Sequence, residues 1–286
     1  MKPGAFDYHR PSTASEAVSM LTELGDDAKI LAGGQSLLPI MNLRLAEPAH
    51  LVDISRVGDL MGADEDTTSV TLGAAITHQA IEDGLVPDPC LGLLTTAAAG
   101  IGYRAIRCRG TVGGSLAHAD SAAEWPTVLT AIGADVTVRS AQDERTVPLR
   151  GFFHGFFTTS LESDELITAV HLPRFAKSTR WALEKTNRKE GEFGESMAVA
   201  IVSEGSASIW LGAAKDVPVN LAHVETLLAD HPADQVPALG EVRDRVAADL
   251  DLSVPELDLA QRHRLQIHAV TVHRALSRAL SPEVPA

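Results

Sequence analysis

A pair of glycines lies in the stretch Lys29-Ile30-Leu31-Ala32-Gly33-Gly34-Gln35-Ser36-Leu37, after a short apolar strand and before a helix expected to begin at Leu37. Glycine accepts positive φ and lets another group come close to the backbone. Successive N–H groups in such a turn form a nest for an anion, and the amino terminus of a helix adds positive potential. The stretch therefore predicts a turn that can bind a pyrophosphate.

A second glycine pair occurs in Thr111-Val112-Gly113-Gly114-Ser115, where the pattern again predicts a strand, a turn and a helix. Asp120 and Glu124 follow, and their carboxylates can accept hydrogen bonds from ribose or ribityl hydroxyls. Neither pair has the G-x-G-x-x-G or the P-loop pattern, so two tight turns without a ligand are an alternative at this point. Four polar side chains beside the glycines would add donors, namely Gln35, Ser36, Thr111 and Ser115.

Local patterns around the glycine pairs predict the surrounding elements. Thr13-Ala14-Ser15-Glu16 is typical of a capping box, and Gly25 is typical of a helix end. With a strand at 51–54, the first pair lies in a β-turn-α-β unit. Ser121-Ala122-Ala123-Glu124 resembles another capping box, before a helix expected to end at Gly133.

The remaining patterns predict an α+β protein. Residues 136–138 and 165–172 are typical of antiparallel strands, and 173–180 of a linker. Beyond the linker we expect strands at 181–185, 197–203 and 206–213, and then three helices near 219–229, 236–248 and 256–280. This last part has the pattern of a separate α+β module.

Composition restricts the possible partners. The chain has 286 residues, with 38 acidic and 24 basic side chains and a formal net charge of −14. That sign disfavours a nucleic-acid binder or a protein that binds anionic membranes, so an anion must be held by local geometry. Cys90 and Cys108 are too few for the four thiolates of a usual iron–sulfur cluster. The amino terminus lacks an apolar signal core, and we expect a soluble, cytoplasmic protein.

Together, Ala32-Gly33-Gly34-Gln35-Ser36-Leu37 and Thr111-Val112-Gly113-Gly114-Ser115 resemble the paired flavin motif of the molybdenum hydroxylases. More narrowly, the whole chain resembles their separate FAD-carrying medium subunit, as in carbon-monoxide dehydrogenase, N-heterocycle oxidoreductases and xanthine dehydrogenase. The resemblance implies two α/β subdomains, at about 1–56 and 57–176, that clasp FAD between them. It also implies a C-terminal α+β domain, at about 177–286, that covers the isoalloxazine side.

The resemblance also implies the cofactor contacts. In the family the first loop holds the pyrophosphate and adenosine part, and the second loop completes the clamp. Lys185 matches a flavin-contacting lysine, and Phe193 matches an aromatic residue beside the isoalloxazine. The matching positions are Lys29, Ile30, Leu31, Ala32, Gly33, Gly34, Gln35, Ser36, Leu37, Ile101, Thr111, Gly113, Gly114, Ser115, Asp120, Glu124, Ile167, Lys185 and Phe193.

Four positions depart from the family pattern. The last loop more often ends Gly-Asp-Tyr, where this chain has Gly191-Glu192-Phe193 and therefore lacks a tyrosine hydroxyl. Glu124 stands where several relatives have Asp, and Ser115 replaces a frequent Asn. None of these changes removes the backbone nest, so we expect one non-covalent FAD per chain. Phe193 is expected to shield one flavin face by stacking; the alternative is that it fills a loop core away from the cofactor.

The resemblance implies the FAD-carrying electron-transfer subunit of a heterotrimeric molybdenum hydroxylase. A large subunit would oxidise the substrate, an N-heterocycle or carbon monoxide, at a molybdenum cofactor. Two [2Fe–2S] clusters in a small subunit would pass the electrons to FAD, and an external acceptor would remove them. We expect a dimer of such trimers, without nucleic acid, a membrane span, or a catalytic side chain or metal in this chain. The alternatives are a stand-alone FAD-dependent oxidase or dehydrogenase, and a structural subunit that has lost its cofactor.

Other polar candidates fit ordinary structural roles. His118 and Asp120 are too few for a metal site and are expected to make polar contacts in a loop. Histidines at 263, 268 and 273 are scattered round a helix at about 100° per residue, so we expect them on the surface. Trp125 and Trp210 are expected in cores.

Overall fold

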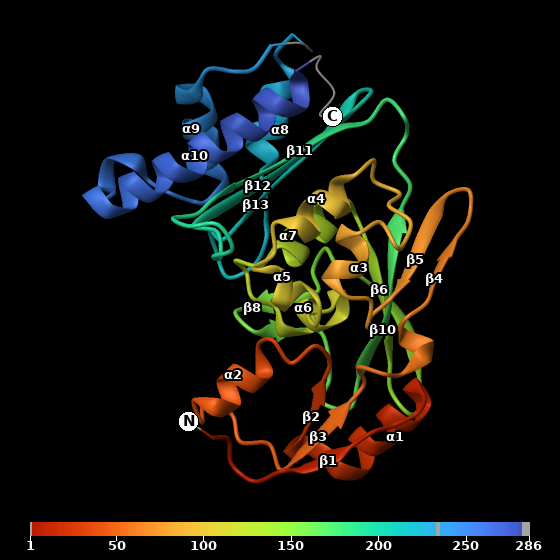
Figure 1. Cartoon of the computed structure of the whole chain (residues 1–286). Coiled ribbons are helices and arrows are strands. Elements are labelled where there is room, and N and C mark those ends of the chain that lie inside the picture. Colours follow the sequence, from red (N-terminus) through yellow and green to blue (C-terminus); the bar gives the residue numbers. More distant parts are fainter. Residues whose placement is uncertain (1, 233–234, 282–286) are drawn as a thin grey trace.

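The computed structural model describes residues 2–232 and 235–281. The three larger sheets of the described residues follow one another along the chain and along the molecule, with the N-terminal sheet at the bottom of Figure 1 and the C-terminal sheet at the top. Helices pack against each sheet, so the predicted α+β class is confirmed. The predicted domain boundaries at 56 and 176 fall in connecting segments and stay predictions. In the described ranges, no helix is both long and apolar enough to cross a bilayer.

The first sheet is parallel and consists of β1 (Asp7–His9), β3 (His50–Asp53) and β2 (Ala28–Leu31), in that order. Helix α1 (Ala14–Leu24) packs on it through a stripe of buried residues that includes Ala17, Val18 and Leu21. A short helix, α2 (Leu37–Asn42), follows β2 as predicted. The 3₁₀ turns Gly25–Asp27 and Gly58–Leu60 connect these elements to their neighbours.

Helix α1 begins and ends where the sequence predicts, with one difference in its cap. The Thr13 hydroxyl accepts a hydrogen bond from the Glu16 N–H at 3.1 Å, and Gly25 ends the helix with a φ of 65°. The Glu16 carboxylate accepts from the N–H and the hydroxyl of Ser12, at 2.6 and 2.7 Å. The return bond of the capping box therefore goes to the residue before the N-cap.

The second sheet is antiparallel and has the order β4-β5-β10-β6-β7. Five short helices pack on one side of it, and Trp125 lies fully buried among them, as predicted. A small hairpin of β8 and β9 lies beside these helices (Figure 1). The strands are β4 (Ala63–Glu65), β5 (Ser69–Gly73), β6 (Asp135–Arg139), β7 (Glu144–Pro148), β8 (Phe153–Gly155), β9 (Thr158–Thr159) and β10 (Leu166–Pro173), and the helices are α3 (His78–Glu82), α4 (Leu93–Ala99), α5 (Arg104–Arg107), α6 (Val112–His118) and α7 (Glu124–Ala131).

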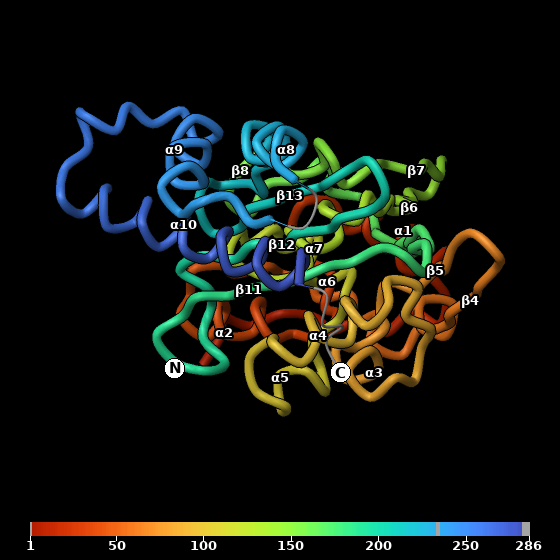
Figure 2. Tube along the Cα trace, turned by 90° about the horizontal axis from the view of Figure 1, so that it is seen from above, coloured from red at the N-terminus to blue at the C-terminus, as the bar shows by residue number. Residues whose placement is uncertain are grey.

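The third sheet has the order β11-β12-β13-β14 and is buried on both faces. One face carries α8, α9 and α10, and Figure 2 shows α10 running across β11 and β12. The other face packs on the second sheet's helices, because Val199, Ile201 and Trp210 join their core. The elements are β11 (Arg180–Thr186), β12 (Ser196–Ser203), β13 (Ser206–Gly212), β14 (Val219–Asn220), α8 (Ala222–Ala229), α9 (Leu239–Asp249), a 3₁₀ turn (Val254–Glu256) and α10 (Leu259–Leu280).

The capping box predicted at residues 121–124 is wrong. Helix α7 begins at Glu124, its N-cap is Ala123, and no side chain caps it. The Glu124 carboxylate instead forms an ion pair with Lys185 of β11. A contact between distant segments has therefore replaced the local one.

Two histidines are buried in apolar surroundings. His78 accepts a hydrogen bond at Nδ1 from the Trp125 indole N–H, at 2.9 Å. His268 places its Nδ1 2.8 Å from the Ser196 hydroxyl, so the prediction that it lies on the surface is wrong. Helix α10 turns this side toward β12. Burial lowers the pKa of each imidazole from 6.5 to about 4.

These pKa shifts predict acid sensitivity. Above pH 6.5 both histidines are neutral in the folded and unfolded states, and stability is fully present. As the pH falls from 6.5 to about 4, only the unfolded state gains protons, so each histidine removes on the order of 3 kcal/mol from the free energy of unfolding. Urea unfolding between pH 4.5 and 8 should show a shallower pH dependence in His78→Asn and His268→Asn. The control His263→Asn, at an exposed position, should keep the wild-type slope; equal slopes in all four proteins would contradict the assignment.

Candidate functional site

The first glycine loop, between β2 and α2, has a row of backbone donors that find no partner in the described part of the chain. No described residue accepts a hydrogen bond from the N–H groups of Gly33, Gly34, Gln35 or Ser36. Gly34 has a φ of 73°, which favours glycine. The Gln35 side-chain amide donates to the Gly33 carbonyl at 3.1 Å and holds the loop from within. Four successive donors on a fixed loop suit a diphosphate, as the sequence predicts.

The second glycine pair differs from its prediction. Gly113 and Gly114 lie in the first turn of α6, with Thr111 as N-cap, and not in a turn after a strand. Their N–H groups are already bonded, Gly113 to the Ala74 carbonyl at 2.9 Å and Gly114 to the Thr111 hydroxyl at 3.1 Å. The Val112 N–H likewise donates to the Ile76 carbonyl at 3.1 Å. This pair offers no nest of free donors, so the prediction of two equivalent nests is wrong.

Close packing explains why the second pair must be glycine. A Cβ on Gly113 would lie 2.5 Å from the Cβ of Ala74, and one on Gly114 would lie 2.8 Å from the Thr111 hydroxyl. Both distances are shorter than any real Cβ contact. The glycines therefore let α6 approach the segment after β5.

The two glycine motifs also pack against each other. A Cβ on Gly33 would lie 2.1 Å from the Arg109 carbonyl oxygen, and one on Gly114 would lie 3.4 Å from the Cβ of Ala32. Figure 1 shows the loop between β2 and α2 at the top of the first sheet, directly below α6. The sequence predicts both motifs, and the structure adds that they form one continuous surface.

A buried ion pair lies near this surface. The Lys185 ammonium is 2.6 Å from the Glu124 carboxylate and donates to the Gly100 carbonyl at 3.1 Å. The two side chains are only 15% and 4% exposed. Burial raises the pKa of Glu124, and Lys185 opposes this shift only in part, while the charge of Asp120 adds to it. The structure thus brings Asp120, Glu124, Lys185 and the residue before Ile101 into one neighbourhood.

The loop that carries Phe193 closes over the other side of Lys185. Gly191 has a φ of 82°, and a Cβ there would lie 3.0 Å from the Tyr103 ring and 3.2 Å from the Gly102 carbonyl. A Cβ on Gly194 would lie 3.3 Å from Cγ of Lys185. Phe193 is 61% exposed, so the alternative that it fills a loop core is wrong. Its stacking on a flavin stays a prediction.

The other predicted contacts occupy varied positions. Lys29 is exposed on β2, whereas Ile30, Leu31, Ala32 and Leu37 are half-buried. Ser36 and Ser115 are half-buried, and their hydroxyls form no hydrogen bond with a described residue. Ile167 is buried in the core. The carbonyl of its neighbour Thr168 accepts a hydrogen bond from the Ala74 N–H, and the Ala74 carbonyl accepts one from Gly113. Strand β10 is therefore linked to the second glycine motif through Ala74.

Within the segment 100–110, sequence reasoning singled out Ile101 as a cofactor contact but missed the other residues. The segment carries Arg104, Arg107 and Arg109 just before the second glycine pair, and it faces the acidic residues Glu82 and Asp83 of the α3 end. This clustering of opposite charges was the available signal. Tyr103, which packs on Gly191, belongs to the same segment.

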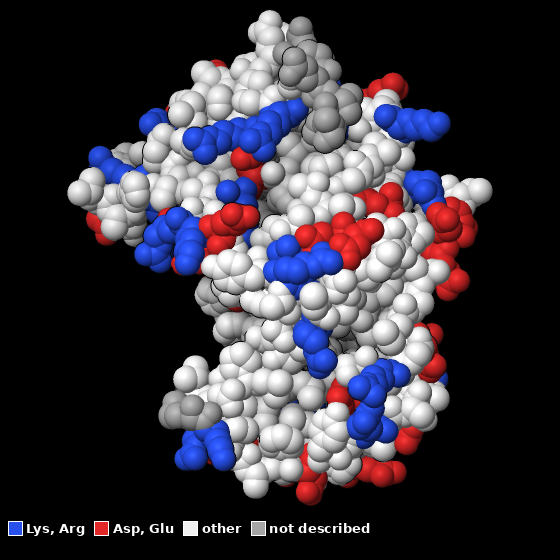
Figure 3. Space-filling view, in the orientation of Figure 1, with Lys and Arg blue, Asp and Glu red and all other residues white. Residues whose placement is uncertain are grey.

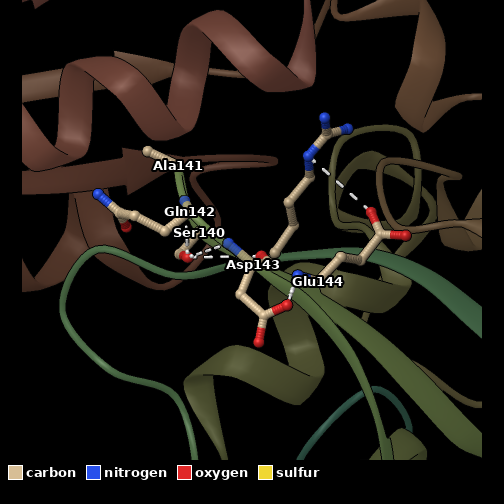
Figure 4. Close-up of a pocket in the computed structure, with 6 residues that line it drawn as sticks. Ser140, Ala141, Gln142, Asp143 and Glu144 are labelled. Carbon is tan, nitrogen blue, oxygen red and sulfur yellow. Dashed lines mark hydrogen bonds and ion pairs between the residues drawn. The ribbon is translucent and has the colours of Figure 1, made fainter.

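The surface near the glycine motifs is hollowed. Figure 3 shows a notch on the left between the part built on the first sheet and the rest of the molecule, with few charged side chains along its border. Another hollow, at the β6–β7 hairpin, is lined by residues 139–144 (Figure 4). There the Ser140 hydroxyl accepts from the N–H groups of Gln142 and Asp143, at 3.2 and 3.1 Å, so the turn satisfies its own polar groups. The hairpin turn therefore differs from the loop between β2 and α2, whose N–H groups bond to no described residue.

Comparisons with known proteins agree with this geometry. A family model described as "FAD binding domain in molybdopterin dehydrogenase" matches residues 4–175. The carbon monoxide dehydrogenase medium chain of Hydrogenophaga pseudoflava is 38% identical over 213 residues, which cover 73% of each chain. The 6-hydroxypseudooxynicotine dehydrogenase complex subunit alpha of Paenarthrobacter nicotinovorans is 35% identical over 286 residues, 98% of this chain and 96% of that protein. The solved quinoline 2-oxidoreductase from Pseudomonas putida 86 matches with a TM-score of 0.86 at 30% identity, over 98% of both chains.

The first loop gives a direct test of FAD binding. Gly34→Val should abolish most FAD affinity, because a β-branched residue disfavours the φ of 73° and a Cβ would meet Leu38 and Leu31 at 3.0 and 3.2 Å. Gly205→Val is a matched control, because Gly205 has a φ of 74° but no atom within 4 Å of its Cβ position. Both variants should lose roughly 1–2 kcal/mol of stability through strain. Fluorescence titration with FAD should separate them; equal affinities would refute the role of this loop.

Phe193 gives a second test. Phe193→Ala should change the flavin absorption envelope and speed its reoxidation at unchanged FAD content, because the exposed ring no longer shields the flavin. The ring's contribution beyond area burial is about 1 kcal/mol. Phe193→Tyr keeps the ring and should be nearly neutral. An alanine variant with the wild-type spectrum and reoxidation rate would show that the ring does not stack on the flavin.

Proposed function

Because this chain belongs to the FAD-binding medium subunits of the molybdenum hydroxylases, we propose that it carries electrons between two partners within one enzyme. It is an FAD-binding oxidoreductase subunit. In the proposed route, a large subunit oxidises the substrate at a molybdenum cofactor, and two [2Fe–2S] clusters in a small subunit deliver the electrons here. Bound FAD supplies the capacity to accept those electrons and release them to an external acceptor.

One observation supports the FAD role above the others, namely that the four N–H groups of residues 33–36 bond to nothing in the ranges 2–232 and 235–281. They would hold the pyrophosphate with backbone dipoles, which suits a chain with a net charge of −14. The half-buried hydroxyls of Ser36 and Ser115 would add donors. In this proposal, residues 1–56 and 57–176 clasp the cofactor and 177–286 cover its isoalloxazine.

In this proposal, two residues of the third sheet and its loop, Lys185 and Phe193, lie on the flavin side. Lys185 and Glu124 form an ion pair at 2.6 Å, with side chains only 15% and 4% exposed. Phe193 would exclude water from one flavin face. No side chain of this chain is needed to transfer a proton to the substrate, because the substrate reacts on another subunit.

The two cysteines support the proposal that the iron–sulfur clusters lie in another subunit. Cys90 is buried, and burial raises the pKa of its thiol, whereas Cys108 is exposed. Two such separate thiols cannot supply the ligands of two [2Fe–2S] clusters, so the proposal places these clusters in a partner. Free cysteines also fit a reducing cytoplasm.

The substrate is chosen elsewhere in this proposal. The relatives named above have different substrates in their names, carbon monoxide, 6-hydroxypseudooxynicotine and quinoline. Such variety agrees with a medium subunit that does not contact the substrate. An N-heterocycle or carbon monoxide is the proposed substrate of the whole complex, and the stretch at 113–120 favours the former.

Copurification with a tagged chain, expressed from its native genome, tests the proposed route of the electrons. A tagged chain should bring down an iron–sulfur subunit and a molybdenum subunit in equal amounts, as a dimer of trimers. The isolated chain should be yellow, with one FAD that acid precipitation releases, and metal analysis should find neither iron nor molybdenum. Turnover of the physiological substrate by the isolated chain would favour a stand-alone flavoenzyme. A colourless chain would favour a structural subunit.

A further inference from the structure

The segment 100–110 contacts every element of the candidate site. The Gly100 carbonyl accepts from Lys185, and Tyr103 packs on Gly191. At its other end, the Arg109 carbonyl lies against Gly33. The segment therefore touches the first glycine loop and the flavin-side loop, and it continues directly into the second glycine pair.

Arg107 ties this segment together from inside. Its Nη1 donates to the carbonyls of Ile101 and Gly102, both at 3.0 Å. Its Nε and Nη2 donate to the two carboxylate oxygens of Glu82, at 2.7 and 2.9 Å. The side chain is only 12% exposed. A planar guanidinium can donate to the two carbonyls and to both oxygens of the carboxylate at once, whereas a lysine ammonium cannot.

Arg104 offers an internal comparison. It binds the same Glu82, at 2.6 Å, and also Asp83, at 2.7 Å, but it donates to no backbone carbonyl of a described residue. Its side chain is 46% exposed. Arg104 forms surface ion pairs, which contribute little to stability, whereas Arg107 also bonds to the turn at Ile101 and Gly102. A comparison of variants at the two positions therefore distinguishes the two effects.

On the basis of the proposed function, we propose that Arg107 is a positioning residue for the flavin. By holding the Ile101 and Gly102 carbonyls, it fixes the turn from which Gly100 binds Lys185 and Tyr103 supports the Gly191–Phe193 loop. The guanidinium itself does not touch the cofactor. Its loss should let this turn shift, and the flavin environment should change with it.

The experiment uses the isolated, FAD-loaded chain and the variants Arg107→Gln, Arg107→Lys and Arg104→Gln. We expect Arg107→Gln to raise the FAD dissociation constant about tenfold and to alter the visible flavin spectrum and midpoint potential, because charged hydrogen bonds to two carbonyls are lost. Arg107→Lys should fall between this variant and wild type. The control Arg104→Gln should stay within about twofold of wild type, with an unchanged spectrum.

The outcomes separate positioning from simple stabilisation. If Arg107→Gln lowers the melting temperature but keeps the affinity, spectrum and potential of Arg104→Gln, the proposal is overturned. If Arg107→Gln does not fold, Arg107→Lys decides by the same three measurements. A wild-type chain that binds no FAD would instead overturn the proposed function, before any variant is compared.

Discussion

The contact between Gly33 and the Arg109 carbonyl is the constraint on which the site depends. A Cβ at this position would lie 2.1 Å from the oxygen, so any side chain would push the first sheet away from the helices of the second. With glycine, the loop that carries the free N–H groups lies directly against the segment leading into α6. That segment in turn reaches the third sheet through Gly100 and Tyr103. One missing side chain therefore sets the relative positions of all three sheets around the notch.

Electrostatics at the site follows from the same packing. The chain is acidic overall, so a phosphate group is attracted only where oriented backbone dipoles outweigh the distant charges. For the buried Glu124–Lys185 pair, the cost of removing two charges from water must be offset. Burying two charges costs several kcal/mol, and their attraction offsets this cost only with good geometry. A distance of 2.6 Å and a further bond to Gly100 provide that geometry, and the pair joins α7 to β11. The pair therefore fixes how α7 lies against β11.

Sequence patterns could predict the elements whose causes are local. The first glycine loop depends on consecutive residues, a strand, a positive φ at Gly34 and a helix start at Leu37, and all of these are found. The second pair has the same dipeptide, but the N–H groups of Gly113 and of the preceding Val112 bond to Ala74 and Ile76 across the fold, and no local pattern reveals such partners. Glu124 likewise leaves its expected cap for Lys185, 61 residues away. Spacing along a helix could not place His268 inside, because that depends on which face β12 covers.

The arrangement also couples cofactor binding to the integrity of the fold. The four free N–H groups lie on the first sheet's loop, whereas Lys185 and Phe193 lie on the third sheet and its loop. A ligand that contacts both binds only when the sheets hold their native positions. Such a ligand stabilises the folded chain by RT ln(1 + [L]/Kd), where L is the free ligand. The segment 100–110 lies between these contacts. Arg107 bonds both to the Ile101 carbonyl of this segment and to Glu82 of α3, and these bonds resist a shift of the segment that would move the contacts apart. The contacts that would hold such a ligand are therefore connected to one another through the same segment.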